Sequence, residues 1–90
     1  MGGKVAAKLQ AKRHGQDVAL YLWVSRQFDR QPYDFRYVVT EALWNIWAFK
    51  CLDRSLVPEL NRAHLVLVAP SGKIVGGSTP EDGAALWVRK

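Results

Sequence analysis

The first quarter of the chain has the polarity pattern of a β-hairpin. Residues 5–13 alternate with a period of two, which is typical of a strand with one buried face. Residues 18–24 (VALYLWV) have the β-branched and aromatic side chains that strands favour. Gly15 lies between the two segments and can adopt the positive φ of a turn. We therefore expect strands over 5–13 and 17–25. A helix over 5–13 is the alternative, because its Ala, Lys, Leu and Gln residues also favour helices.

The period changes after Pro32. Apolar residues then recur at spacings of three and four, which places them on one stripe of a helix over residues 35–52. Pro32 and Asp34 suit the first turn of that helix. The stripe that we expect to face the core consists of Phe35, Val39, Ala42, Leu43, Ile46 and Phe49.

The second half of the chain predicts another hairpin and another helix. Residues 65–68 (LVLV) read as a buried strand, 70–73 (PSGK) as a turn and 73–76 as the returning strand. Thr79, Pro80 and the acids after them have the order expected where a helix begins, so we expect a helix over 80–90. A last strand over 85–89 is the alternative.

The predicted element order is ββαββα, which indicates an α+β fold. We expect an antiparallel four-stranded sheet with helices on one face, forming a single domain over residues 1–90. The alternative is a winged-helix-like α+β fold, in which 5–13 and 16–29 are helices and the hairpin at 64–76 is the wing.

Charge and composition narrow the choice of partner. The net charge is +5, and Lys4, Lys8, Lys12 and Arg13 all precede the first acid. This basic balance suits a nucleic acid or an acidic protein. The chain has no apolar run approaching the roughly 18 residues of a membrane span and no apolar core of a signal peptide. A single cysteine, Cys51, excludes an internal disulfide, which fits a reducing compartment. Together with the lack of a long apolar run, this leads us to expect a cytoplasmic protein that does not bind membranes.

Two sets of aromatic side chains fall outside the predicted core. In residues 18–24, Tyr21 and Trp23 point away from the aliphatic residues, because side chains alternate along a strand. In the helix, Tyr37 and Trp44 lie seven residues apart on a second apolar stripe. Trp and Tyr are favoured interface anchors. The sequence therefore predicts a homodimer whose candidate interface residues are Tyr37 and Trp44 or, alternatively, Tyr21 and Trp23.

Nucleic-acid binding is the alternative that the first hairpin suggests. Lys8 and Lys12 belong to the polar row of their strand and could share a sheet face with Tyr21 and Trp23. Aromatic rings stack on unpaired bases, and ammonium groups meet phosphates. The candidate nucleic-acid contacts are Lys4, Lys8, Lys12 and Arg13, beside the two aromatic residues.

No catalytic pattern emerges. His14 and His64 have no neighbours at metal-ligand spacing, and one cysteine cannot build a structural zinc site. The acids are scattered, and the SGK at 71–73 lacks the preceding glycine of a phosphate loop. We therefore expect a small, basic, non-enzymatic binding protein with no cofactor or metal, acting as a homodimeric interaction module or as a nucleic-acid-binding accessory or regulatory protein.

Overall fold

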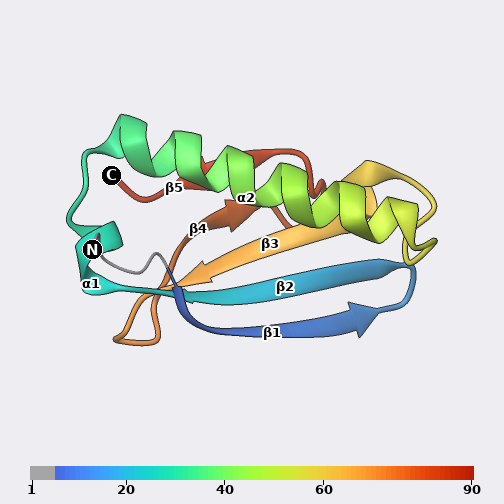
Figure 1. Ribbon diagram of the computed structural model, residues 1–90, viewed down its shortest axis with the longest axis horizontal. Coiled ribbons are helices and arrows are strands. Elements are labelled where there is room, and N and C mark those ends of the chain that lie inside the picture. Colours follow the sequence, from blue (N-terminus) through green and yellow to red (C-terminus); the bar gives the residue numbers. More distant parts are fainter. Residues whose placement is uncertain (1–5) are drawn as a thin grey trace.

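The computed structural model describes residues 6–90, which form one sheet covered on one face by a long helix (Figure 1). The strands are β1 (Ala6–His14), β2 (Asp17–Val24), β3 (Ala63–Val68), β4 (Ile74–Ser78) and β5 (Leu86–Val88), and the helices are α1 (Arg26–Asp29), α2 (Tyr33–Asp53) and the 3₁₀ helix η1 (Leu60–Arg62). Over these residues the sheet has five strands in the order β1-β2-β3-β4-β5. The expected α+β class is confirmed, and the sheet is larger than expected.

The first hairpin forms as expected. β1 and β2 pair antiparallel, with Lys8 opposite Trp23 and His14 opposite Asp17. Gly15 has a φ of 62° in the turn between them. The described part of segment 5–13 is therefore a strand, which rules out the winged-helix alternative.

The pairing of β2 with β3 corrects the all-antiparallel expectation. These two strands run parallel, from Val18 opposite Ala63 to Trp23 opposite Val68. The 21-residue helix α2 is the physical reason. At about 1.5 Å per residue it spans about 31 Å, enough to carry the chain back along the whole sheet before β3 begins.

The end of the chain is a strand and not the expected helix. β5 pairs antiparallel with β4, with Trp87 opposite Gly77. The groups that resemble a helix start stabilise a loop instead: Thr79 Oγ1 donates to the carbonyl oxygen of Asp82, and the Asp82 carboxylate accepts from the backbone N–H of Ala84. The loop also packs directly on η1 and the start of β3, and its backbone is held there because the N–H of Gly83 donates to the carbonyl of Asn61 at 2.8 Å.

α2 packs on the sheet through a different stripe from the one expected. Its buried residues are Arg36, Thr40, Trp44, Ala48 and Cys51. They cover the inner face of the sheet, whose buried residues include Val18, Leu22, Val24, Leu65, Leu67 and Val75. The expected burial of the aliphatic row of β2 is therefore confirmed.

The expected core stripe lies mostly in solvent. Phe35, Ile46 and Phe49 are 50%, 66% and 55% exposed. Ala42 is also exposed, while Val39 and Leu43 lie half-buried at the edge of the core. The buried stripe combines the fully buried Thr40 and Ala48 with the larger Trp44 and Arg36.

Candidate functional site

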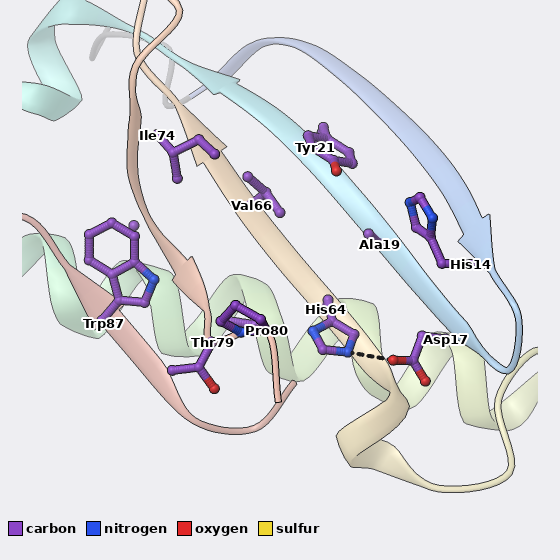
Figure 2. Close-up of a pocket in the computed structure, with 12 residues that line it drawn as sticks. His14, Asp17, Ala19, Tyr21, His64, Val66, Ile74, Thr79, Pro80 and Trp87 are labelled. Carbon is purple, nitrogen blue, oxygen red and sulfur yellow. Dashed lines mark hydrogen bonds and ion pairs between the residues drawn. The ribbon is translucent and has the colours of Figure 1, made fainter. Parts of the chain in front are cut away.

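The face of the sheet opposite α2 is open and hollowed. We call it the open face and define it by residues that point away from α2 on neighbouring strands: Lys8, Lys12, Tyr21, Trp23, His64, Val66, Ile74 and Trp87. A cavity of about 440 Å³ lies on it. Tyr21 and Trp87 lie on opposite sides of that cavity, with Val66 and Ile74 between them (Figure 2).

One cross-strand row explains the hollow. Tyr21 lies opposite Val66, Val66 opposite Gly77, and Gly77 opposite Trp87. Gly77 has a φ of 120° and no side chain, and a Cβ there would collide with the backbone of Leu65. The row therefore lacks a side chain between Val66 and Trp87, which leaves space beside the indole ring.

Lysines from β1 lie over the aromatic rings of β2. Lys8 Nζ is 4.7 Å from the Trp23 ring centroid, and Lys12 Nζ is 5.1 Å from that of Tyr21. The two rings are themselves 6.4 Å apart and tilted by 35°. The hairpin thus presents neighbouring aromatic surfaces with an ammonium group beside each.

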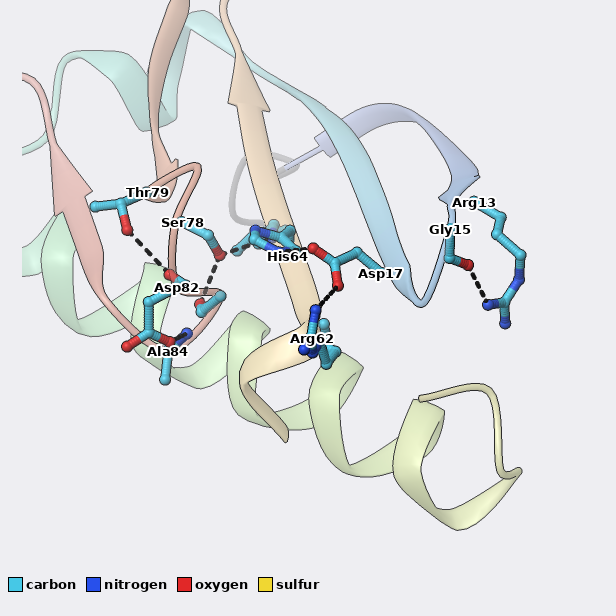
Figure 3. A network of polar contacts seen from close by, with 12 residues as sticks. Arg13, Gly15, Asp17, Arg62, His64, Ser78, Thr79, Asp82 and Ala84 are labelled. Carbon is cyan, nitrogen blue, oxygen red and sulfur yellow. Dashed lines mark hydrogen bonds and ion pairs between the residues drawn. The ribbon is translucent and has the colours of Figure 1, made fainter. Parts of the chain in front are cut away.

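A polar cluster closes one end of the cavity (Figure 3). His64 Nε2 and the Asp17 Oδ2 atom are 3.1 Å apart, and Arg62 Nη1 donates to Asp17 Oδ1 at 3.3 Å. Burial raises the pKa of Asp17, but hydrogen bonds from Arg62 and His64 and their charges outweigh that effect, so the pKa lies below its ordinary value. The carboxylate is therefore ionised at neutral pH and has cationic and hydrogen-bonding partners.

The serine and cysteine side chains that could act as nucleophiles are either hydrogen-bonded to the backbone or buried. Ser78 Oγ accepts from the backbone N–H of Leu65 and donates to the carbonyl of Gly83. Cys51 is a buried residue of α2, on the other face of the sheet, and burial raises the pKa of its thiol. Within residues 6–90 no three His, Cys, Asp or Glu side chains come together as a metal site.

The structure brings four of the sequence-predicted residues together and separates the rest. Lys8, Lys12, Tyr21 and Trp23 share the open face. Arg13 donates instead to the carbonyl of Leu56, on the other side of the hairpin, at 2.6 Å. Lys4 lies outside the described residues.

The helix aromatics have different places from those expected. Trp44 is only 8% exposed, and its indole N–H donates to the carbonyl of Ala63 at 2.8 Å. In this fold it is a core residue, so it is not available as an interface anchor. Tyr37 is half-buried, with its ring 6.2 Å from that of Tyr33.

Trp87 and His64 are the functional candidates that sequence reasoning missed. The signal for Trp87 was present in the alternative strand over 85–89. Because side chains alternate along a strand, Trp87 points to the other face of the sheet from Leu86 and Val88. His64 becomes visible only once β2 and β3 pair and place it beside Asp17.

Comparisons with known proteins add no assignment. No protein-family model, no curated protein and no solved structure matches the chain. In the part of the chain that the structure describes, none of the helices has the length and apolarity needed to cross a membrane.

Proposed function

We propose that this protein binds single-stranded nucleic acid on the open face of its sheet. The observation that supports this most strongly is the placement of Tyr21, Trp23 and Trp87 on one hollowed face with two lysines beside them. Stacking on aromatic rings and contact between cations and phosphates are the two interactions that unpaired strands use. Stacking needs bases that are free of a duplex, which favours single strands.

The energies of the competing contacts favour replacing a lysine over an aromatic ring with a stacked base. An exposed lysine over an aromatic ring contributes about 0.5–1 kcal/mol, whereas a base stacked on such a ring contributes about 1–3 kcal/mol. A base can therefore displace Lys8 from Trp23 or Lys12 from Tyr21. The displaced ammonium groups remain beside the strand, where they meet its phosphates.

The cavity offers a second place for a base. Its volume of about 440 Å³ lies within the range of small-ligand sites. Val66 and Ile74 supply an apolar floor, and Trp87 supplies a wall that is 37% exposed. Because Asp17 is paired with Arg62 and His64, its charge is offset where the strand would pass.

A titration of labelled oligonucleotides tests the proposal. The protein is added to a single-stranded and a duplex oligonucleotide at about 50 and 200 mM salt, and tryptophan fluorescence is recorded alongside. We expect micromolar or tighter binding to the single strand, quenching of tryptophan, and weaker binding at the higher salt. Absence of binding at the lower salt contradicts the proposal, because attraction to phosphates is strongest there.

Matched tyrosine variants locate the contact. Tyr21→Ala should weaken binding by about 5- to 150-fold, which corresponds to the loss of one stacked base. Tyr21→Phe keeps the ring and should bind like the unchanged protein. Tyr33→Ala removes a tyrosine from the start of α2 and should also bind normally. Equal affinities for Tyr21→Ala and Tyr33→Ala would exclude the open face as the site.

A further inference from the structure

The face of α2 that points away from the sheet carries an apolar stripe. It consists of Phe35, Val38, Ala42, Ile46 and Phe49, which we call the outer stripe. Val38 is 61% exposed and Ile46 66%, and both phenylalanines are at least half exposed. At about 100° per residue, these five positions cluster opposite the buried stripe centred on Trp44.

The outer stripe is comparable in size to the main apolar patch of a typical monomer. From Phe35 to Phe49 it runs about 21 Å along the helix at 1.5 Å per residue. A phenylalanine can bury roughly 150–250 Å², so two half-exposed rings with Val38 and Ile46 offer apolar area on the order of 300 Å². The largest apolar patch on a typical monomer is about 300–600 Å² and is often functional, so the size of the outer stripe is compatible with an interaction surface.

The order of residues in the stripe indicates what covers it. The spacings are three, four, four and three, and they are symmetric about Ala42. Like residues occupy the mirrored positions: Phe35 and Phe49 lie seven residues from Ala42, and the β-branched Val38 and Ile46 lie four residues from it. A two-fold interface is self-complementary, so residue i meets j while j meets i. Mirrored positions of this kind let each residue meet a similar residue of a second copy across a two-fold axis, which favours self-pairing.

We propose that two copies of this chain form an antiparallel dimer through the outer stripe, with the two-fold axis at Ala42. Phe35 then packs on Phe49 of the partner subunit, and Val38 packs on Ile46 of the partner subunit. The small side chain of Ala42 lets the helices approach at the crossing point. A shallow hollow lies where the partner's Phe35 would arrive, with Ile46, Phe49 and Leu52 as its apolar lining and Lys50, Asp53 and Arg54 as its charged lining.

Charge at the helix ends agrees with the antiparallel direction. Asp34 is in the first turn of α2, and the other end carries Lys50, Asp53 and the C-cap residue Arg54, whose charges sum to a net positive charge. An antiparallel pair places the acidic end of one helix at the basic end of the other and opposes their dipoles. The open faces of the two sheets then lie on the outside of the dimer. The dimer stands independently of the proposed function, because the outer stripe and the open face are on opposite sides of the molecule.

Light scattering over a range of concentrations measures the association. We expect dimers at about 100 μM protein, and a dissociation constant more than tenfold higher for Ile46→Asp. Leu9→Asp is the matched control, since Leu9 on β1 is 65% exposed, almost the same fraction as Ile46. Circular dichroism checks that both variants fold. Monomers at this concentration, or a dimer that Ile46→Asp leaves intact, would overturn the proposal.

Single cysteines determine the direction of pairing. A disulfide requires Cβ atoms about 3.5–4.5 Å apart, and the native Cys51 is buried. Ala42→Cys should cross-link to itself. Val38→Cys and Ile46→Cys should each stay uncross-linked alone and should cross-link when mixed. Efficient cross-linking of Val38→Cys alone would indicate parallel helices and would overturn the antiparallel dimer.

Discussion

The open face of the sheet and the outer stripe of α2 are both exposed and partly apolar, but they differ in shape and charge. The open face is hollowed, aromatic and bordered by Lys8, Lys12 and His64. The outer stripe consists of Phe and aliphatic residues along a single convex helix. Cations beside rings suit a phosphate-bearing strand with free bases, whereas an uncharged, symmetric stripe suits a second copy. Exposed apolar area alone therefore does not identify a partner.

The largest expected effect concerns the two stripes of α2. Trp44→Ala should lower the free energy of unfolding by about 3–5 kcal/mol, because it empties the core and removes a hydrogen bond to Ala63. Phe49→Ala should cost much less, since that ring is 55% exposed. Urea unfolding at low protein concentration, where the proposed dimer is dissociated, measures both. Equal losses would show that the outer stripe is part of the core.

The expectation that the exposed stripe would face the core shows which features of α2 can be predicted from the sequence and which cannot. A helix over 35–52 followed from the spacing of its apolar residues, and the first hairpin from alternation and Gly15. The outer stripe is the more apolar of the two, however, because the buried stripe contains Arg36 and Thr40, so apolar periodicity indicates the face that lies in solvent. Burial of Arg36 depends on hydrogen bonds to the carbonyls of Gln31 and Arg89, and the second of these partners lies 53 residues away in the sequence.

The pairing of strands that lie far apart in the sequence was the second feature that could not be predicted. The parallel pairing of β2 with β3 depends on the path of the chain through α2, and no local signal reports it. β5 was not the main prediction, because residues 79–82 resemble the start of a helix. In the structure they stabilise a loop that packs on η1 and β3. The candidate site was therefore predictable on β1 and β2, where contacts are local. It was not predictable at His64, which reaches the open face through strand order, and Trp87 was indicated only by the alternative strand over 85–89.

A smaller effect is expected in the salt dependence of nucleic-acid binding, which distinguishes the lysines of the open face from arginines elsewhere on the surface. Each phosphate contact contributes about 0.7 to the slope of log affinity against log salt for single strands. Replacing both Lys8 and Lys12 with Ala should therefore lower the slope by about 1.4. Arg26→Ala with Arg30→Ala removes the same charge from residues in and next to α1, outside the cavity, and should change the slope less. Identical slopes for the two double variants would remove the lysines from the site.

The smallest expected effect is the acid dependence of the Asp17 cluster. The pKa of Asp17 is lower in the folded state than its ordinary value of 3.8. Its contribution to stability is therefore fully present above pH 3.8 and is lost as the pH falls through the folded pKa. Asp17→Asn should flatten the fall in unfolding free energy over this acid range by less than about 1 kcal/mol, because the pair is partly exposed. An unchanged pH profile would show that the cluster does not contribute.

Ultraviolet cross-linking of the protein to a single-stranded oligonucleotide, followed by mass spectrometry of the peptides, tests the central claim most directly. The open face predicts cross-links at Tyr21, Trp23 or Trp87, and none at Trp44, which is buried in the core. Cross-links confined to Phe35 and Phe49 on the outer stripe would contradict the account, because the nucleic acid would then occupy the face assigned to a second copy.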